Sequence, residues 1–88
     1  MDVLVGSVVR SKAGRDKGSY FMVLAREGEY AYLANGELRK VDCPKKKKLK
    51  HLQGSDKISA FIVNKLEAQG KVTNSEVRKA LAELVDTN

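Results

Sequence analysis

Two clusters of cationic side chains in the first part of the chain are the residues best suited to chemistry with a partner. One cluster surrounds a glycine-bracketed turn, and the other follows Pro44; together they comprise Arg10, Lys12, Arg15, Lys17, Lys45, Lys46, Lys47, Lys48 and Lys50. A cation that meets a phosphate releases condensed counterions, and an arginine can also grip a phosphate with two hydrogen bonds or stack on a base. These residue types therefore predict binding to a polyanion.

The distribution of charge along the chain supports this interpretation. The formal net charge is +6, and residues 1–54 carry 12 Lys/Arg against 6 Asp/Glu. Residues 55–88 carry 5 of each, so the whole excess lies in the first part. This asymmetry indicates a basic region that meets a polyanion and a neutral region that packs or contacts protein.

Catalysis and metal binding find little support among the remaining reactive side chains. Cys43 and His51 are the chain's single cysteine and single histidine, whereas a structural zinc site normally needs four ligands. A nucleophilic Cys-His pair would need hydrogen-bond contact and an oxyanion donor, and no local signature indicates either. The sequence predicts no enzyme activity, no metal, no cofactor and no small-molecule substrate.

The turn Gly14-Arg15-Asp16-Lys17-Gly18 lies between two apolar segments, Val8-Val9 and residues 21–25, which are expected to be strands. Glycine reaches backbone angles that a Cβ forbids, so one glycine at each end allows a tight connection with both cations at its tip. Asp16, between two cations, is expected to stabilise the turn by local hydrogen bonds. We expect Gly14, Asp16 and Gly18 to be structural and Arg15 and Lys17 to face a partner.

Residues 5–25 resemble the KOW motif of ribosomal proteins and transcription elongation factors. Gly6 matches the glycine that opens the first strand of that motif, and residues 14–18 match its turn of glycine, basic, acidic, basic, glycine. Ser7 departs from the acidic residue that usually follows the opening glycine. The resemblance implies a small SH3-like β-barrel that binds RNA. The whole chain most closely resembles short bacterial KOW-domain RNA-binding proteins, which are related to KOW-type large-subunit proteins of archaeal and eukaryotic ribosomes.

The spacing of apolar residues and turn signals predicts five short strands in the first part of the chain. They are expected near residues 6–12, 19–26, 30–34, 37–43 and 48–52. The second strand is apolar on both faces, which is typical of a central strand. Asn35-Gly36 predicts a two-residue type I′ hairpin, and Pro44 ends the strand after it.

The run Lys45-Lys46-Lys47-Lys48 is predicted to be mobile in the free protein. Four adjacent lysines repel one another, so ordering them carries a free-energy cost until an anionic partner neutralises them. We therefore expect the basic segment 45–51 to order on contact with RNA, while the hairpin tip docks as a rigid element.

After Gly54 the apolar spacing changes to that of helices. The first helix has Ser55 or Asp56 as its candidate N-cap and Gly70 as its C′ residue. Thr73-Asn74-Ser75-Glu76 has the form of a capping box, which starts a second helix. The inward residues of that helix are expected to be Val77, Ala80, Leu81, Leu84 and Val85. Glu76 and Glu83 lie beside its cations, which disfavours a DNA-reading helix-turn-helix.

The predicted fold is mainly β with C-terminal α structure, in one structural unit. Residues 1–54 form an SH3-like barrel, and residues 55–88 form a helical hairpin packed on it. The predicted function is RNA binding, and the KOW resemblance implies ribosomal RNA as the target. The predicted location is the cytoplasm, because no leader or membrane-spanning segment is recognisable. The alternatives are a protein-interaction adaptor that uses the helices and loose membrane attachment, which lacks an amphipathic apolar face. The three tyrosines are expected at the core or barrel edge.

Overall fold

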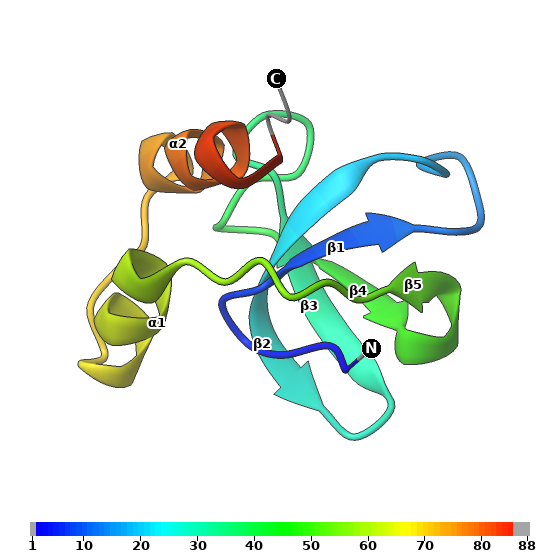
Figure 1. Cartoon of the computed structure of the whole chain (residues 1–88), viewed down its shortest axis with the longest axis horizontal. Coiled ribbons are helices and arrows are strands. Elements are labelled where there is room, and N and C mark those ends of the chain that lie inside the picture. Colours follow the sequence, from blue (N-terminus) through cyan, green and yellow to red (C-terminus); the bar gives the residue numbers. More distant parts are fainter. Residues whose placement is uncertain (1, 86–88) are drawn as a thin grey trace.

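The computed structural model describes residues 2–85, in which five antiparallel strands form one sheet in the order β4-β3-β2-β1-β5 (Figure 1). The strands are β1 (Val8–Ser11), β2 (Tyr20–Glu27), β3 (Tyr30–Ala34), β4 (Lys45–Lys48) and β5 (Leu52–Gln53). The first three lie within two residues of their predicted bounds. A register shift between Val23 and Ala25 interrupts the ladder of β2 with β3.

The sheet is strongly curved, because its two edge strands are close neighbours in the sequence. A single 3-10 turn, η1 (Leu49–His51), joins β4 at one edge to β5 at the other. Four Cα–Cα steps span at most about 15 Å, so the end of one edge strand must lie near the start of the other. The predicted closing strand over residues 48–52 is thus wrong in detail: most of it is the 3-10 turn.

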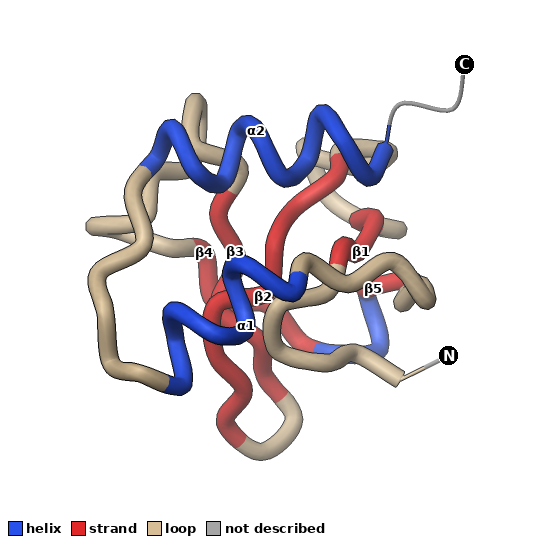
Figure 2. The backbone as a smooth tube through the Cα atoms, turned by 60° about the vertical axis from the view of Figure 1, so that its left-hand side comes forward, coloured by secondary structure: helices blue, strands red, loops and turns tan. Residues whose placement is uncertain are grey.

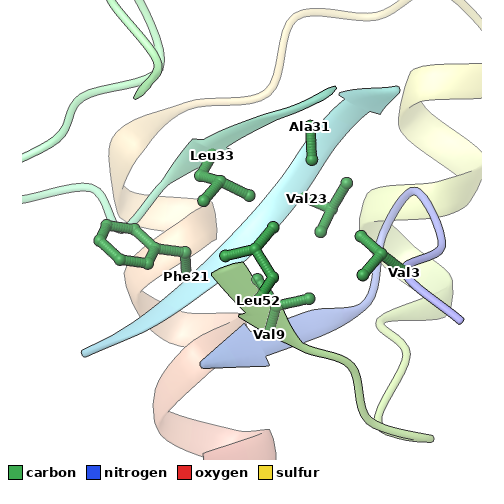
Figure 3. Close-up of a cluster of buried hydrophobic side chains, with 7 residues drawn as sticks. All are labelled: Val3, Val9, Phe21, Val23, Ala31, Leu33 and Leu52. Atoms are coloured by element: carbon green, nitrogen blue, oxygen red, sulfur yellow. The ribbon is translucent and has the colours of Figure 1, made fainter. Parts of the chain in front are cut away.

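The concave side of the sheet encloses the first hydrophobic cluster (Figure 3). Its buried members come from four strands and the N-terminal segment: Val3, Val9, Phe21, Val23, Ala31, Leu33 and Leu52. Phe21 and Val23 point into this cluster from β2, whereas Met22 between them belongs to a second cluster. The prediction that β2 is central and apolar on both faces is therefore confirmed.

The second cluster lies between the opposite face of the sheet and the two helices, α1 (Ala60–Glu67) and α2 (Asn74–Val85). Val8 and Met22 from the sheet pack there with Ile62 of α1 and Val77 and Ala80 of α2. Figure 2 shows α2 lying across one end of the sheet, with α1 below it. Leu81, Leu84 and Val85 pack against the same cluster, as predicted.

Gly6 occupies a position that no other residue could take without rearrangement. Its φ is +85°, and a Cβ there would clash with the side chain of Val63 on α1. The Gly6 carbonyl also accepts a hydrogen bond from Ser59 N–H, the N-cap residue of α1. The glycine at the start of the first strand therefore allows the helix to approach the sheet closely.

The predicted strand over residues 37–43 is wrong; this segment is a loop. The Asn35 side-chain oxygen accepts hydrogen bonds from the N–H groups of Glu37 and Arg39, which bends the chain back on itself. Gly36 has φ +79°, but Asn35 does not have a positive φ, so the two residues do not form a type I′ turn. The N-terminal turn of α2 holds the loop, because Asn74 Oδ1 accepts from Val41 N–H at 2.8 Å.

At both ends of α1 the residue that ends the helix is not the one predicted from the sequence. Ser59, rather than Ser55 or Asp56, caps α1, and its hydroxyl accepts from Ile62 N–H. At the other end the left-handed residue is Gln69, with φ 59°, rather than Gly70. Gly70 N–H bonds to Lys65 C=O and Gln69 N–H to Leu66 C=O, which is the Schellman pattern. The capping box of α2 is confirmed by reciprocal bonds between Thr73 and Glu76.

Neither helix within residues 2–85 combines the length and the apolar character needed to cross a membrane.

Candidate nucleic-acid interface

Asp16, at the tip of the β1–β2 turn, connects that turn to β4. Its Oδ1 lies 2.6 Å from Lys47 Nζ, and its Oδ2 forms an ion pair with Lys45 Nζ at 2.8 Å. Lys47 Nζ also donates to Ser11 Oγ and to Ala13 C=O, both at 2.7 Å. All three ammonium hydrogens of Lys47 thus have partners, which satisfies a cation whose side chain is only 9% exposed.

The carboxylate of Asp16 is held in its charged form. Burial alone would raise its pKa, but hydrogen bonds from Lys45, Lys47 and Ser11 and the charge of Lys47 outweigh burial and hold the pKa well below the usual value of 3.8. The structure confirms that Asp16 stabilises its own turn through Ser11 Oγ at 2.7 Å. It also fixes the turn to a strand that lies far away in the sequence, which the sequence did not indicate.

The two glycines of the turn have the conformations that the sequence predicted. Gly14 and Gly18 have φ values of +84° and +91°. Gly18 N–H donates to Ser11 C=O and Lys17 N–H to Gly14 C=O, so the backbone of the turn is fixed by its own hydrogen bonds. Arg15 and Lys17 between them are exposed, and the structure therefore presents both cations at a rigid tip.

The predicted mobility of residues 45–48 is wrong, because these four lysines form β4 and pair with β3. Successive side chains of a strand point to opposite faces, which separates the lysines into two pairs. Lys45 and Lys47 pair with Leu33 and Ala31 on the concave face and meet Asp16 there, so their mutual repulsion is neutralised locally. Lys46 and Lys48 are exposed on the other face.

On the convex face of β3 and β4, two tyrosines lie beside the exposed lysines. Tyr32 pairs with Lys46 and Tyr30 with Lys48 across the ladder. Lys46 Nζ lies 4.6 Å from the centre of the Tyr30 ring and 6.0 Å from that of Tyr32, within the range of cation–π attraction. Both side chains are half-buried on β3, the strand next to the edge strand β4.

The other predicted contact residues line two hollows, one on each side of the turn. Arg10, Lys12 and Lys17 line the first hollow, together with Gln53 of β5. Arg15 and Lys45 line the second, together with Arg39. Lys50 is exposed in η1, and its neighbour His51 accepts a hydrogen bond from Lys12 N–H, which brings η1 next to the first hollow.

The basic elements lie together on one side of the molecule. Figure 1 shows the β1–β2 turn and the β4–β5 connection on the right and both helices on the left. Seven of the nine predicted cations are exposed: Arg10, Lys12, Arg15, Lys17, Lys46, Lys48 and Lys50. Lys45 is half-buried, and Lys47 is buried against Asp16, so the prediction that Lys47 meets a partner does not fit its position.

Two candidate contact residues were not predicted from the sequence. Arg39 joins Arg15 and Lys45 only because its segment is a loop that folds back beside the turn. Tyr20 is 42% exposed, and the Arg10 guanidinium lies 5.7 Å from the centre of its ring. Tyr20 pairs directly with Arg10 across β1 and β2. A register of β1 with β2 predicted from the sequence could have indicated the Arg10–Tyr20 contact. No local pattern indicated that Arg39 lies beside Arg15 and Lys45.

A comparison of the sequence with models of known protein families found no match, and a comparison with curated proteins found none either.

Proposed function

We propose that this chain is an RNA-binding protein of the KOW type, built on an SH3-like barrel, and that its rigid basic side binds phosphates of structured RNA. The observation that carries the proposal is the contact of Asp16 with Lys45 and Lys47. This contact joins the basic turn to the lysine strand, so that two cationic segments far apart in the sequence act as one surface. The same contact pairs Asp16, the only carboxylate of the turn, with two lysines, so that it does not neutralise Arg15 and Lys17.

The geometry suits a folded polyphosphate better than a flexible one. Ladder hydrogen bonds fix the backbones of β1 and β4, and the turn is fixed by its own backbone hydrogen bonds, so the cations that these segments carry are attached at set positions. Phosphate contacts determine how a protein is positioned on RNA, whereas they read little sequence. The KOW resemblance of residues 5–25 makes ribosomal RNA the proposed target, with the protein acting in the cytoplasm as a ribosomal or ribosome-associated component.

The test is the salt dependence of affinity for a structured RNA. Each phosphate contact contributes about 0.7 to 0.9 to the slope of log affinity against log salt. We expect Lys46→Ala with Lys48→Ala to lower the slope by about 1.5. The matched control removes the same charge from the helical side with Lys71→Ala and Lys79→Ala, two exposed lysines, and should leave the slope unchanged. Equal losses in both double variants, or a flat salt response, would contradict the proposal.

Crosslinking in cells, followed by sequencing of the attached RNA, identifies the target. Ribosomal RNA fragments that co-migrate with a ribosomal subunit in a gradient are the expected result. Crosslinks spread over many messenger RNAs would exclude the ribosomal assignment while leaving RNA binding intact.

A second candidate function is supported by the apolar surface around α1. Phe61 on α1 is 58% exposed, and Ile58 and Leu4 are also exposed beside the same helix region. Phe61 lines a hollow with Glu76 and Lys79, and a different hollow beside α1 is lined by apolar residues together with Arg26 and Glu67: Val5, Leu24, Ala25, Val63 and Leu66. This surface would suit a protein partner, so the chain could act as an adaptor. Binding to a protein that persists after nuclease treatment and is lost in Phe61→Ser would favour this function.

A further inference from the structure

One face of the sheet is covered by the helices along only part of its length. The row formed by Val8 and Met22 lies under α2 and belongs to the second hydrophobic cluster. Two residues along each strand, on the same face, the next row contains Arg10 and Tyr20. Arg10 also pairs with Gln53 across β1 and β5, so Tyr20, Arg10 and Gln53 form one continuous row over three strands. All three side chains are exposed.

This row borders two adjoining hollows of different chemistry, which we describe as the two halves of one site. The first half, with a volume of about 220 Å³, is lined by Tyr20, by the valines Val8, Val9 and Val85, and by residues 53–55 and Lys57. The second half, of about 230 Å³, is lined by Lys12, Lys17 and Gly18. Arg10 and Gln53 line both halves, which makes the two hollows neighbours. An aromatic and apolar compartment therefore adjoins a cationic one.

We propose that this hollow, the Tyr20 site, binds one unpaired nucleotide of the RNA. The base would stack against the Tyr20 ring and the Arg10 guanidinium, because an aromatic ring and a guanidinium plane are the flat surfaces on which unpaired bases stack. The Gln53 amide would meet the base edge, since it can both donate and accept hydrogen bonds. Lys12 and Lys17 would hold the adjoining phosphates.

The exposure of Tyr20 supports this assignment over a packing role. Its ring is 42% exposed, and α2 reaches the hollow beside it with Val85, the residue at its C-terminal end. The Arg10–Tyr20 contact is ready-made, because a ladder pair fixes both residues and the guanidinium lies close to Gly18. Tyr30 and Tyr32 offer a weaker alternative, because both side chains are half-buried and the Tyr32 hydroxyl donates to Glu27.

This inference rests on the proposed RNA binding and specifies the RNA as one with an unpaired base. It predicts that the protein discriminates between two RNAs with equal numbers of phosphates: an uninterrupted duplex and the same duplex with a few central pairs replaced by mismatches. Base stacking on an aromatic ring typically changes affinity by about five- to a hundredfold. We expect the wild-type protein to prefer the mismatched RNA by roughly tenfold.

The variant that tests the site is Tyr20→Ala, with Tyr20→Phe and Tyr30→Ala as controls. Tyr20→Ala should lose the tenfold preference and keep its affinity for the intact duplex within about twofold. Tyr20→Phe retains a stacking ring and should keep the preference, as should Tyr30→Ala, which removes a tyrosine outside the site. Gln53→Ala, on the short edge strand, supplies a second variant: it should reduce discrimination among RNAs that differ only in the unpaired base.

The outcomes separate the site from the proposed function. Three results would overturn the Tyr20 site and leave RNA binding in place: salt-dependent binding to both RNAs with no preference in the wild type, a preference for the mismatched RNA that survives in Tyr20→Ala, or discrimination among unpaired bases that is unchanged in Gln53→Ala. Failure to bind either RNA in a salt-dependent manner would overturn RNA binding itself. A preference that is lost in Tyr20→Ala and retained in Tyr20→Phe supports the site.

Discussion

Substituting Lys47 should destabilise the protein far more than substituting Lys46, although the two lysines are neighbours in one strand. Lys47→Met removes a buried ammonium and leaves the Asp16 carboxylate, whose side chain is only 16% exposed, with Lys45 as its remaining cation. Breaking a fully buried ion pair costs about 3–5 kcal/mol. Because Lys45 still neutralises part of the charge, we expect a loss of about 2–3 kcal/mol in the free energy of unfolding.

Lys46→Met is the matched control, since it makes the same change on the exposed face of the same strand. The substitution removes the contact of Nζ with the Tyr30 ring, which contributes at most about 1 kcal/mol at such a site. Urea unfolding followed by circular dichroism measures both variants, and their m-values should match that of the wild type. In thermal unfolding, Lys47→Met should melt roughly 10–20 °C below the wild type, given about 4–8 °C per kcal/mol for a domain of this size.

A double-mutant cycle identifies the partner of Lys47. Asp16→Asn combined with Lys47→Met should be less destabilised than the sum of the single variants, because each single change leaves an uncompensated charge that the double variant lacks. We expect a coupling of at least about 1 kcal/mol. Equal stabilities of Lys46→Met and Lys47→Met, or additive effects of the two changes in the cycle, would refute the role assigned to Asp16.

Two further predictions concern acid stability and the end of α1. The pKa of Asp16 is lower in the folded state than in the unfolded state, so its contribution is fully present above about pH 5 and is lost as the pH falls through about 4 and below. Urea unfolding between pH 5 and pH 2 should therefore show a shallower loss of stability for Asp16→Asn than for the wild type. Gln69→Gly should raise the free energy of unfolding by up to about 1 kcal/mol, because Gln69 has φ 59°. Ala68→Gly, at a negative φ, should lower it, and a loss in both variants would contradict the argument.

The parts of the fold that the sequence predicted correctly are those fixed by local chemistry. The capping box of α2 joins residues three apart, and the continuous apolar run of β2 reflects burial on both faces. The glycines of the β1–β2 turn were predicted because their positive φ is a requirement of the turn itself. In each case the feature that predicts the structure lies within the segment itself.

The two largest departures from the sequence prediction each involve a partner that is distant in the sequence. The lysine run was predicted to be mobile because its own charges repel, yet Lys47 bonds to Asp16, which is 31 residues away. Likewise, residues 37–43 were predicted to be a strand because they lie between the hairpin signal Asn35-Gly36 and Pro44, but the Asn35 side chain turns the chain and Asn74, 33 residues from Val41, holds the loop on α2. No property of either segment alone contains these contacts.

The order of β4 changes the energetics that we expect for the proposed RNA binding. Fixing the backbone of one residue costs about 1–2 kcal/mol, so a mobile run of four lysines would lose several kcal/mol of affinity on ordering. In this protein the ladder with β3 meets that cost during folding, and Asp16 removes the repulsion that would otherwise oppose it. The arrangement withdraws two lysines from the surface and leaves the others at fixed spacing. A surface of fixed cations discriminates between polyanions by the positions of their phosphates, which is the property that recognition of a folded RNA requires.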